Sequence, residues 1–560
     1  MDTTEPAALL TALGEEYFRV RHTYDPWNAT LLGLDEFDHL VNDPDPQADA
    51  EAAAALRSVQ QRADDLDPRE LTADQQVDRD VLISLARGAA TDAEDSLWAA
   101  NVSADGYVSP QGLVFQALPV MSAAGPDGTD AYLTRLAALP RMFGALAERY
   151  RSEIAGGRTP TRVGVVNAIE QLEDYLALDD AEDVLLEPAR AASCETQAAA
   201  IIGGQVRPAL IEFLRALSED VAPHGRPDDR VGIDQIPGGD QAYARAVARH
   251  TTTDRTPEEI HQLGHDVLAE LEAGWSAVGG RVLGIADPIE VRKALRVDPR
   301  LRYETSEQIV QGARAALDRA MATLGEYYDG PPIPPCDIVE INPVEAKHSA
   351  MAYYRPPALD GSRHGAYCVL TTLPRERFRY EYEALAFHES VPGHHLQLAA
   401  CQQLDIPRYR RHLDIEACGF NEGWGLYTEL LAEEIGLYSG DVDLLGRLSF
   451  TAMRACRLVV DTGMHHLGWS RQRAIDFMRA NTATNEPNIV NEIDRYIVWP
   501  GQALAYMVGQ REILRLREDA RARLGSAFTL TQFHRRVLQY GAVPLSVLAA
   551  TLGRWTADEH

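Results

Sequence analysis

The sequence is short of basic side chains. Its 560 residues include 53 Lys and Arg against 84 Asp and Glu, which gives a net charge of −31 at pH 7 with His neutral. Nucleic-acid binding needs clustered Lys and Arg to neutralise phosphates, and the sequence contains no such basic block. The composition therefore excludes a nucleic-acid partner, and so acidic a surface is also repelled by anionic membranes.

The sequence contains neither paired cysteines nor long apolar runs, and its first residues do not predict a leader. The six cysteines form no C-x-x-C pair, so we expect reduced, mostly buried thiols. The longest uncharged stretch near the C-terminus, residues 537–553, is short and is broken by Gly541 and Pro544, which excludes a membrane span there. The N-terminus has neither the basic nor the apolar region of a secretory signal. We therefore expect a cytoplasmic protein with no membrane partner; its oligomeric state stays open.

The pattern that dominates the chain is helical. Ala, Leu, Arg and Glu are abundant, and apolar residues recur at spacings of three and four. Residues 336–372 differ, because β-branched and aromatic runs are separated by Pro and Asp-Gly turns, and they predict a small antiparallel sheet. We expect a mainly α fold. A Pro/Asp/Gly-rich stretch at 222–240 separates an N-terminal helical region (1–225) from a catalytic helical region (226–560), unless the two form one continuous fold.

A His-Glu pair follows the predicted sheet, in the run His388-Glu389-Ser390-Val391-Pro392-Gly393-His394-His395. It is similar to H-E-x-x-H, in which two imidazoles hold Zn²⁺ and the Glu takes a proton from bound water. The spacing does not suit a regular helix, because Pro392 occupies position i+4 and His395 lies about 10.5 Å along the axis. A two-residue bulge at 391–393, which Pro and Gly permit, would bring His394 to the i+4 place. We therefore predict His388 and His394 as ligands and Glu389 as general base. His395 is the alternative second ligand, or else a neighbour of the ligands.

A catalytic zinc ion usually has three protein ligands and one position open for water. Two carboxylates stand on the next predicted helix, in the segment Glu422-Gly423-Trp424-Gly425-Leu426-Tyr427-Thr428-Glu429. Glu422 would complete a His₂Glu set, and Glu429 would support the ligands from behind or replace Glu422. This set makes one zinc ion the first choice, although ligand types alone do not separate zinc from manganese or cobalt.

Together, these two motifs resemble those of the DUF885 family of bacterial proteins. Other matching segments are 26–30, 457–465, 500–506 and 541–545, so the resemblance covers nearly the whole chain. The family is similar to helical zinc peptidases with a glutamate third ligand, such as angiotensin-converting enzyme, thimet-type oligopeptidases and helical carboxypeptidases. The resemblance implies a large multi-helix metallopeptidase-like fold with a deep active-site cleft. It also implies a late tyrosine, Tyr496 or Tyr506, that donates to the tetrahedral intermediate.

Several further residues are predicted to act on the substrate. Asp461 and His465 are four residues apart, so on a helix the carboxylate would orient the imidazole toward an oxyanion. Arg495 would receive a substrate carboxylate, as suits a carboxypeptidase. The strand around Tyr353 and Tyr354 would offer an edge with which an extended peptide can pair.

The sequence therefore predicts a metal-dependent hydrolase, most directly a zinc peptidase of carboxypeptidase or small-oligopeptidase type that acts on a peptide or small amide. Two other classes stay open. One is a metallohydrolase of non-peptide amides or esters, and the other is a non-catalytic protein that binds metal or peptides.

Overall fold

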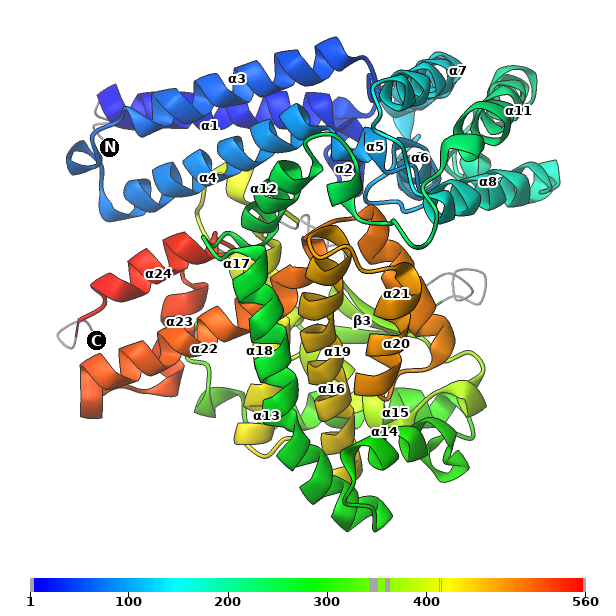
Figure 1. The fold of residues 1–560 in the computed structure, drawn as a ribbon. Coiled ribbons are helices and arrows are strands. Elements are labelled where there is room, and N and C mark those ends of the chain that lie inside the picture. The colour runs from blue at the N-terminus through cyan, green and yellow to red at the C-terminus, as the bar shows by residue number, and fades with distance from the viewer. Residues whose placement is uncertain (1–4, 342–350, 358–362, 412, 414, 557–560) are drawn as a thin grey trace. The chain divides into compact units, whose positions relative to one another are not determined.

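The computed structural model describes residues 5–341, 351–357, 363–411, 413 and 415–556 (Figure 1). Helices make up most of this part of the chain, and one three-stranded sheet interrupts them. The prediction of a mainly α fold is confirmed. None of the described helices is long and apolar enough to cross a membrane. None of the six cysteines, all of which are described, forms a disulfide.

The chain divides into two compact units. Unit 1 comprises residues 1–246, 464–473 and 491–500, and unit 2 comprises residues 247–463, 474–490 and 501–560. The chain first passes from unit 1 to unit 2 after residue 246, downstream of the boundary at residue 225 that the sequence predicts. Two short segments from the C-terminal part of the chain, 464–473 and 491–500, also belong to unit 1. The composition along the chain does not predict this.

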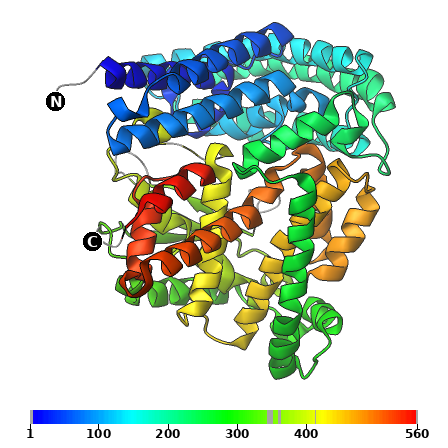
Figure 2. The ribbon, with the colours of Figure 1, turned by 60° about the vertical axis from the view of Figure 1, so that its left-hand side comes forward.

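In unit 1, three long helices lie side by side near the N-terminus (Figures 1 and 2). They are α1 (Glu5–Tyr24), α3 (Pro46–Asp64) and α4 (Ala73–Asp95). Asp45 caps α3 by accepting the Gln47 N–H, and Thr72 forms a reciprocal capping box with Gln75 at the start of α4. Local side-chain chemistry thus determines where these two helices begin.

A hydrophobic core in the rest of unit 1 is built by α7 (Gly125–Ala155), α8 (Arg162–Leu176) and α11 (Arg207–Ala216). Buried side chains of α7 recur at helical spacing, and they include Leu136, Leu139, Phe143 and Leu146. The apolar stripe that the sequence shows is therefore the face that α7 buries.

The sheet of unit 2 consists of β1 (Cys336–Glu340), β2 (Ala352–Arg355) and β3 (Gly365–Val369), in the order β1-β3-β2. It lies within the predicted range, but it is mixed rather than antiparallel. β2 pairs antiparallel with β3, whereas β1 pairs parallel with β3. Because the chain between β1 and β3 contains β2 and its connections, it is long enough for the parallel return, which turn signals do not reveal.

The two faces of β3 differ in character. Ala366 and Cys368 belong to a small hydrophobic cluster with Ile341 and Leu370, so the alternating residues Gly365 and Tyr367 point to the opposite face. A Cβ on Gly365 would lie 3.1 Å from Nδ1 of His395. The Gly365 face of the sheet therefore lies against the chain that follows the His-Glu pair.

Two helices of unit 2 approach each other at glycines. They are α18 (Cys418–Glu434) and α22 (Ala505–Leu524). A Cβ on Gly423 would lie 2.6 Å from the Cα of Gly509, and a Cβ on Gly509 would lie 1.9 Å from the Gly419 carbonyl oxygen. Only glycine permits so close an approach. This contact fixes the helix that carries Glu422 and Glu429.

Candidate metal site

The helix that carries the His-Glu pair ends and restarts between the two candidate histidine ligands. α16 (Tyr382–Glu389) stops after Glu389, and α17 (His394–Cys401) begins at His394. The prediction of a bulge within one continuous helix is therefore wrong in form. In the last backbone hydrogen bond of α16, the Ser390 N–H donates to the Ala386 carbonyl at 2.9 Å. Pro392 has no N–H with which to continue the helix.

Two residues hold this break in place. A Cβ on Gly393 would lie 1.8 Å from the carbonyl oxygen of His388, so a larger residue cannot fit unless the chain moves. Trp424 of α18 donates its indole N–H to the Pro392 carbonyl, at 3.0 Å. The break is thus packed against α18, the helix that carries the candidate ligand Glu422.

Replacing Gly393 by Ala should lower the free energy of unfolding by about 1–3 kcal/mol, because the added methyl group collides with the backbone of His388. Chemical denaturation of the two proteins measures this. Gly280 in α13 (Pro257–Leu283) is the matched control, since no described atom beyond its own turn of helix lies within 4 Å of its Cβ position. G280A should keep or increase stability, as Ala favours helix over Gly. An unchanged unfolding free energy for G393A would contradict the prediction.

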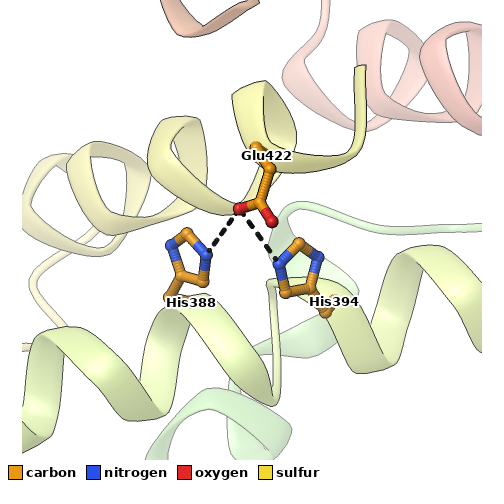
Figure 3. A group of neighbouring side chains, drawn as sticks. All are labelled: His388, His394 and Glu422. Atoms are coloured by element: carbon orange, nitrogen blue, oxygen red, sulfur yellow. Dashed lines mark ion pairs between the residues drawn. The ribbon is translucent and has the colours of Figure 1, made fainter. Parts of the chain in front are cut away.

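His388, His394 and Glu422 converge from α16, α17 and α18 (Figure 3). Oε2 of Glu422 lies 3.4 Å from Nε2 of His388 and 3.7 Å from Nε2 of His394. The three ligand atoms all lie within 4.8 Å of one another. Tetrahedral donors about 2.0–2.2 Å from a zinc ion are about 3.3–3.6 Å apart. The observed separations therefore suit a His₂Glu site.

The groups behind the ligands fix their rings. Nδ1 of His388 lies 2.8 Å from Oε1 of the buried Glu429, an arrangement that leaves Nε2 as the free acceptor nitrogen. A Cβ on Gly425 would lie 2.6 Å from Cε1 of His388, so glycine makes room for this ring. Nδ1 of His394 lies 3.4 Å from Oε1 of Gln397. Glu429 thus stands where the sequence predicts a supporting carboxylate.

Charge within the group favours a cation. Burial opposes the charged form of both imidazoles, but hydrogen bonds to Glu422 and Glu429 outweigh it and raise the pKa of His388 to about 10. The pKa of His394 is raised in the same way by Glu422. Burial also opposes the charged form of Glu422, yet the two imidazoles hold its pKa well below the usual value. A divalent cation would supply to these three groups the positive charge that protons otherwise provide.

Glu389 lies at the end of α16 and is 8% exposed. Within the part of the chain that the structure describes, its carboxylate has no hydrogen-bond or ion-pair partner. Its charge contributes to the raised pKa of both His388 and His394. A buried, unpaired carboxylate is costly to maintain, and such groups are typical of sites that transfer protons.

His395, the alternative second ligand, is engaged elsewhere. Its Nδ1 lies 2.9 Å from the Tyr354 hydroxyl and its Nε2 lies 2.9 Å from the Pro334 carbonyl oxygen. With both ring nitrogens used, it is His394 that joins His388. Tyr354 therefore faces the metal-site helices, whereas its neighbour Tyr353 packs against the hydrophobic cluster on the other face of the sheet.

The prediction that Asp461 orients His465 is wrong. In unit 1, Nδ1 of His465 accepts the Ile233 N–H at 3.1 Å and Nε2 donates to the Tyr496 carbonyl at 2.9 Å. Burial lowers the pKa of His465 to about 4 and keeps the ring neutral. The Asp461 carboxylate, in unit 2, accepts the Gly501 N–H at 3.1 Å. Backbone groups distant in sequence thus take both ring nitrogens, and none is left for an oxyanion.

The remaining predicted substrate residues are divided between the units. Tyr496 and Arg495 belong to unit 1, where the Tyr496 hydroxyl donates to Glu492 and Arg495 lies 3.2 Å from the same carboxylate. Tyr506 belongs to unit 2, together with the metal-site group, and stacks under the guanidinium of Arg457 at 4.3 Å. Their roles toward a substrate stay predictions.

Sequence reasoning missed a tyrosine beside the proposed base. Tyr367 of β3 is fully buried, and its hydroxyl has no hydrogen-bond partner among the described residues. Burial raises its pKa well above the usual value, and the charge of Glu389 adds to the effect. The only signal in the sequence is the predicted strand, which does not indicate which of its faces lies against the helices.

The chain resembles proteins of known structure along nearly its whole length. It matches no curated protein. A crystal structure from Colwellia psychrerythraea, described as a "putative lipoprotein", is 25% identical, with a TM-score of 0.89 and 100% of both chains covered. A structure from Shewanella oneidensis, described as a "putative lipoprotein of unknown function", is 17% identical, with a TM-score of 0.74 over 97% of this chain and 100% of that one. This second likeness shows a shared fold.

The sequence match extends over almost the entire chain. Residues 26–552 match the family described as "Bacterial protein of unknown function (DUF885)". The matched range includes both helices of the His-Glu motif and the α18 helix that carries Glu422. The chain belongs to the DUF885 family.

Proposed function

We propose that this protein is a metal-dependent hydrolase, specifically a zinc peptidase in which His388, His394 and Glu422 hold one zinc ion. The proposal rests on the carboxylate of Glu389, which is buried and makes no hydrogen bond or ion pair with the described residues. This carboxylate lies near the three convergent ligand atoms and its charge acts on His388. A purely structural metal site does not need such a carboxylate, because structural zinc sites are closed by their ligands.

The chemistry divides between the metal and the chain. A bound zinc ion would polarise the scissile carbonyl and lower the pKa of a water molecule from 15.7 toward about 7. Glu389 would accept the proton of the attacking water and return it to the leaving amine. Glu429 would keep Nε2 of His388 directed at the site by accepting the hydrogen bond from Nδ1.

The strand beside the candidate metal site favours a peptide as the substrate. Among the described strands, β2 lies at the edge of the sheet, and it packs against α16. An extended peptide can add to such an edge through main-chain hydrogen bonds. Tyr354 on β2 contacts His395, the neighbour of a candidate ligand, so a peptide at this edge would lie near the metal-site helices. The predicted deep cleft is part of this proposal.

A panel of peptides with free and blocked termini tests the proposal. The zinc-loaded protein should cleave some of them, lose this activity with a chelator and recover it on addition of zinc. Cleavage only of peptides with a free C-terminus would identify a carboxypeptidase. Hydrolysis confined to non-peptide amides or esters would favour the alternative hydrolase, and a zinc-saturated protein that hydrolyses none of these substrates would contradict the proposal.

Zinc binding should depend on pH. In the metal-free protein the pKa of His388 is about 10, so at pH 7 its ring holds a proton that zinc must displace, and Glu422 raises the pKa of His394 as well. We expect release of at least about one proton per zinc ion at pH 7, and an affinity that weakens as the pH falls. Calorimetry in buffers of different ionisation enthalpy measures this number. Binding without proton release would contradict the assignment of these imidazoles as ligands.

A further inference from the structure

Arg454 lies behind the candidate metal site, on α19 (Asp441–His465), and it is 5% exposed. Its Nη2 atom lies 3.6 Å from Oε1 of Glu429. That same oxygen lies 2.8 Å from Nδ1 of His388. Within unit 2, the guanidinium of Arg454 therefore contacts the carboxylate of Glu429, which in turn contacts the candidate metal ligand His388, and all three side chains are buried.

The guanidinium of Arg454 has few other polar partners among the described residues. Its Nε and Nη1 atoms have no hydrogen-bond partner among the described residues, and neither does Oε2 of Glu429. The guanidinium also lies over the ring of Phe450, 4.6 Å from its centre. Glu429 is the one described carboxylate within 4.0 Å of it. The arginine and the glutamate thus compensate each other's charge in the interior of unit 2.

We propose that Arg454 is a positioning residue for the metal centre and acts through Glu429. A buried carboxylate with no compensating cation is strongly disfavoured, so the guanidinium of Arg454 holds the carboxylate of Glu429 in place behind His388. Carboxylates behind a ligating histidine orient the ring and strengthen its binding to metal. The inference rests on the proposed function, because it requires that His388, His394 and Glu422 bind zinc.

Zinc affinity, measured by competition with a chromogenic chelator, tests this role without reference to activity. R454M should bind zinc about 10–100-fold more weakly than the wild type. R454K, which keeps the positive charge, should recover part of the loss. Arg517 is the matched control, because it is also buried and pairs at 2.7 Å with Glu434 of the same helix α18. R517M should bind zinc as the wild type does.

A double-mutant cycle separates an effect through Glu429 from an effect by another route. In the E429Q background, R454M should change the zinc dissociation constant by no more than about twofold, because the residue it acts on is already neutral. An equal loss in both backgrounds would overturn the inference and point to another buried carboxyl near Arg454, that of Glu381. Wild-type affinity in R454M would overturn the inference alone. A wild type that binds no zinc would overturn the proposed function as well.

Discussion

Replacing Glu389 by Gln should reduce hydrolysis by about 10²–10⁴-fold while zinc stays bound. Gln is nearly isosteric with Glu but cannot accept the proton of the attacking water. The carboxylate of Glu389 makes no hydrogen bond or ion pair with the described residues, so its loss removes little that holds the fold. Steady-state kinetics and metal analysis of the same sample measure the two quantities.

Glu383 is the matched control for this variant. It lies on the same helix α16, but its carboxylate accepts the Ser439 N–H at 2.8 Å and pairs with Arg319. E383Q should keep its hydrolytic rate even if it loses some thermal stability. Full activity in E389Q, or loss of zinc together with activity, would show that Glu389 is not the general base.

Removing any one of the three candidate ligands should weaken zinc binding strongly. The loss of affinity should exceed the loss of about 10–100-fold that is expected when a supporting residue is removed. H388A, H394A and E422A each delete one atom of the group whose members lie within 4.8 Å of one another. Equilibrium dialysis followed by metal analysis measures the occupancy. Hydrolysis should fall in parallel with occupancy, because the same ion is needed for both.

His395 provides the internal control for the ligand set. It is the direct neighbour of His394, yet its two ring nitrogens are bonded to Tyr354 and to the Pro334 carbonyl. H395A should therefore keep full zinc occupancy, whereas H394A should not. The opposite result would assign His395 as the second ligand.

The candidate ligand set could be predicted from the sequence because its chemistry restricts the residue types. A His-Glu pair, a further His after Pro392 and Gly393, and a later Glu leave few combinations that can surround one cation. The form of the turn was harder to predict. A helix that ends and restarts and a helix with a bulge contain the same residues, and they differ only in backbone contacts such as that of Trp424 with Pro392.

The residues that were predicted wrongly depend on contacts distant in sequence. His465 is held by Ile233 and by the Tyr496 carbonyl, and no spacing rule connects these positions. The parallel pairing of β1 with β3 depends on how the intervening chain returns. Arg454 has no local motif, because only the packing of α19 brings it to Glu429. Local capping and periodicity predict helices, whereas such distant contacts decide what each side chain does.

The most direct test of the account is X-ray absorption at the zinc edge on zinc-loaded, purified protein, combined with a metal count per chain. The account predicts one zinc ion per chain, with two imidazole nitrogens and carboxylate oxygen at about 2.0–2.2 Å. H388A and H394A should each remove one imidazole from this shell. A protein that binds no zinc at saturation, or a shell that keeps both imidazoles in these variants, would contradict it.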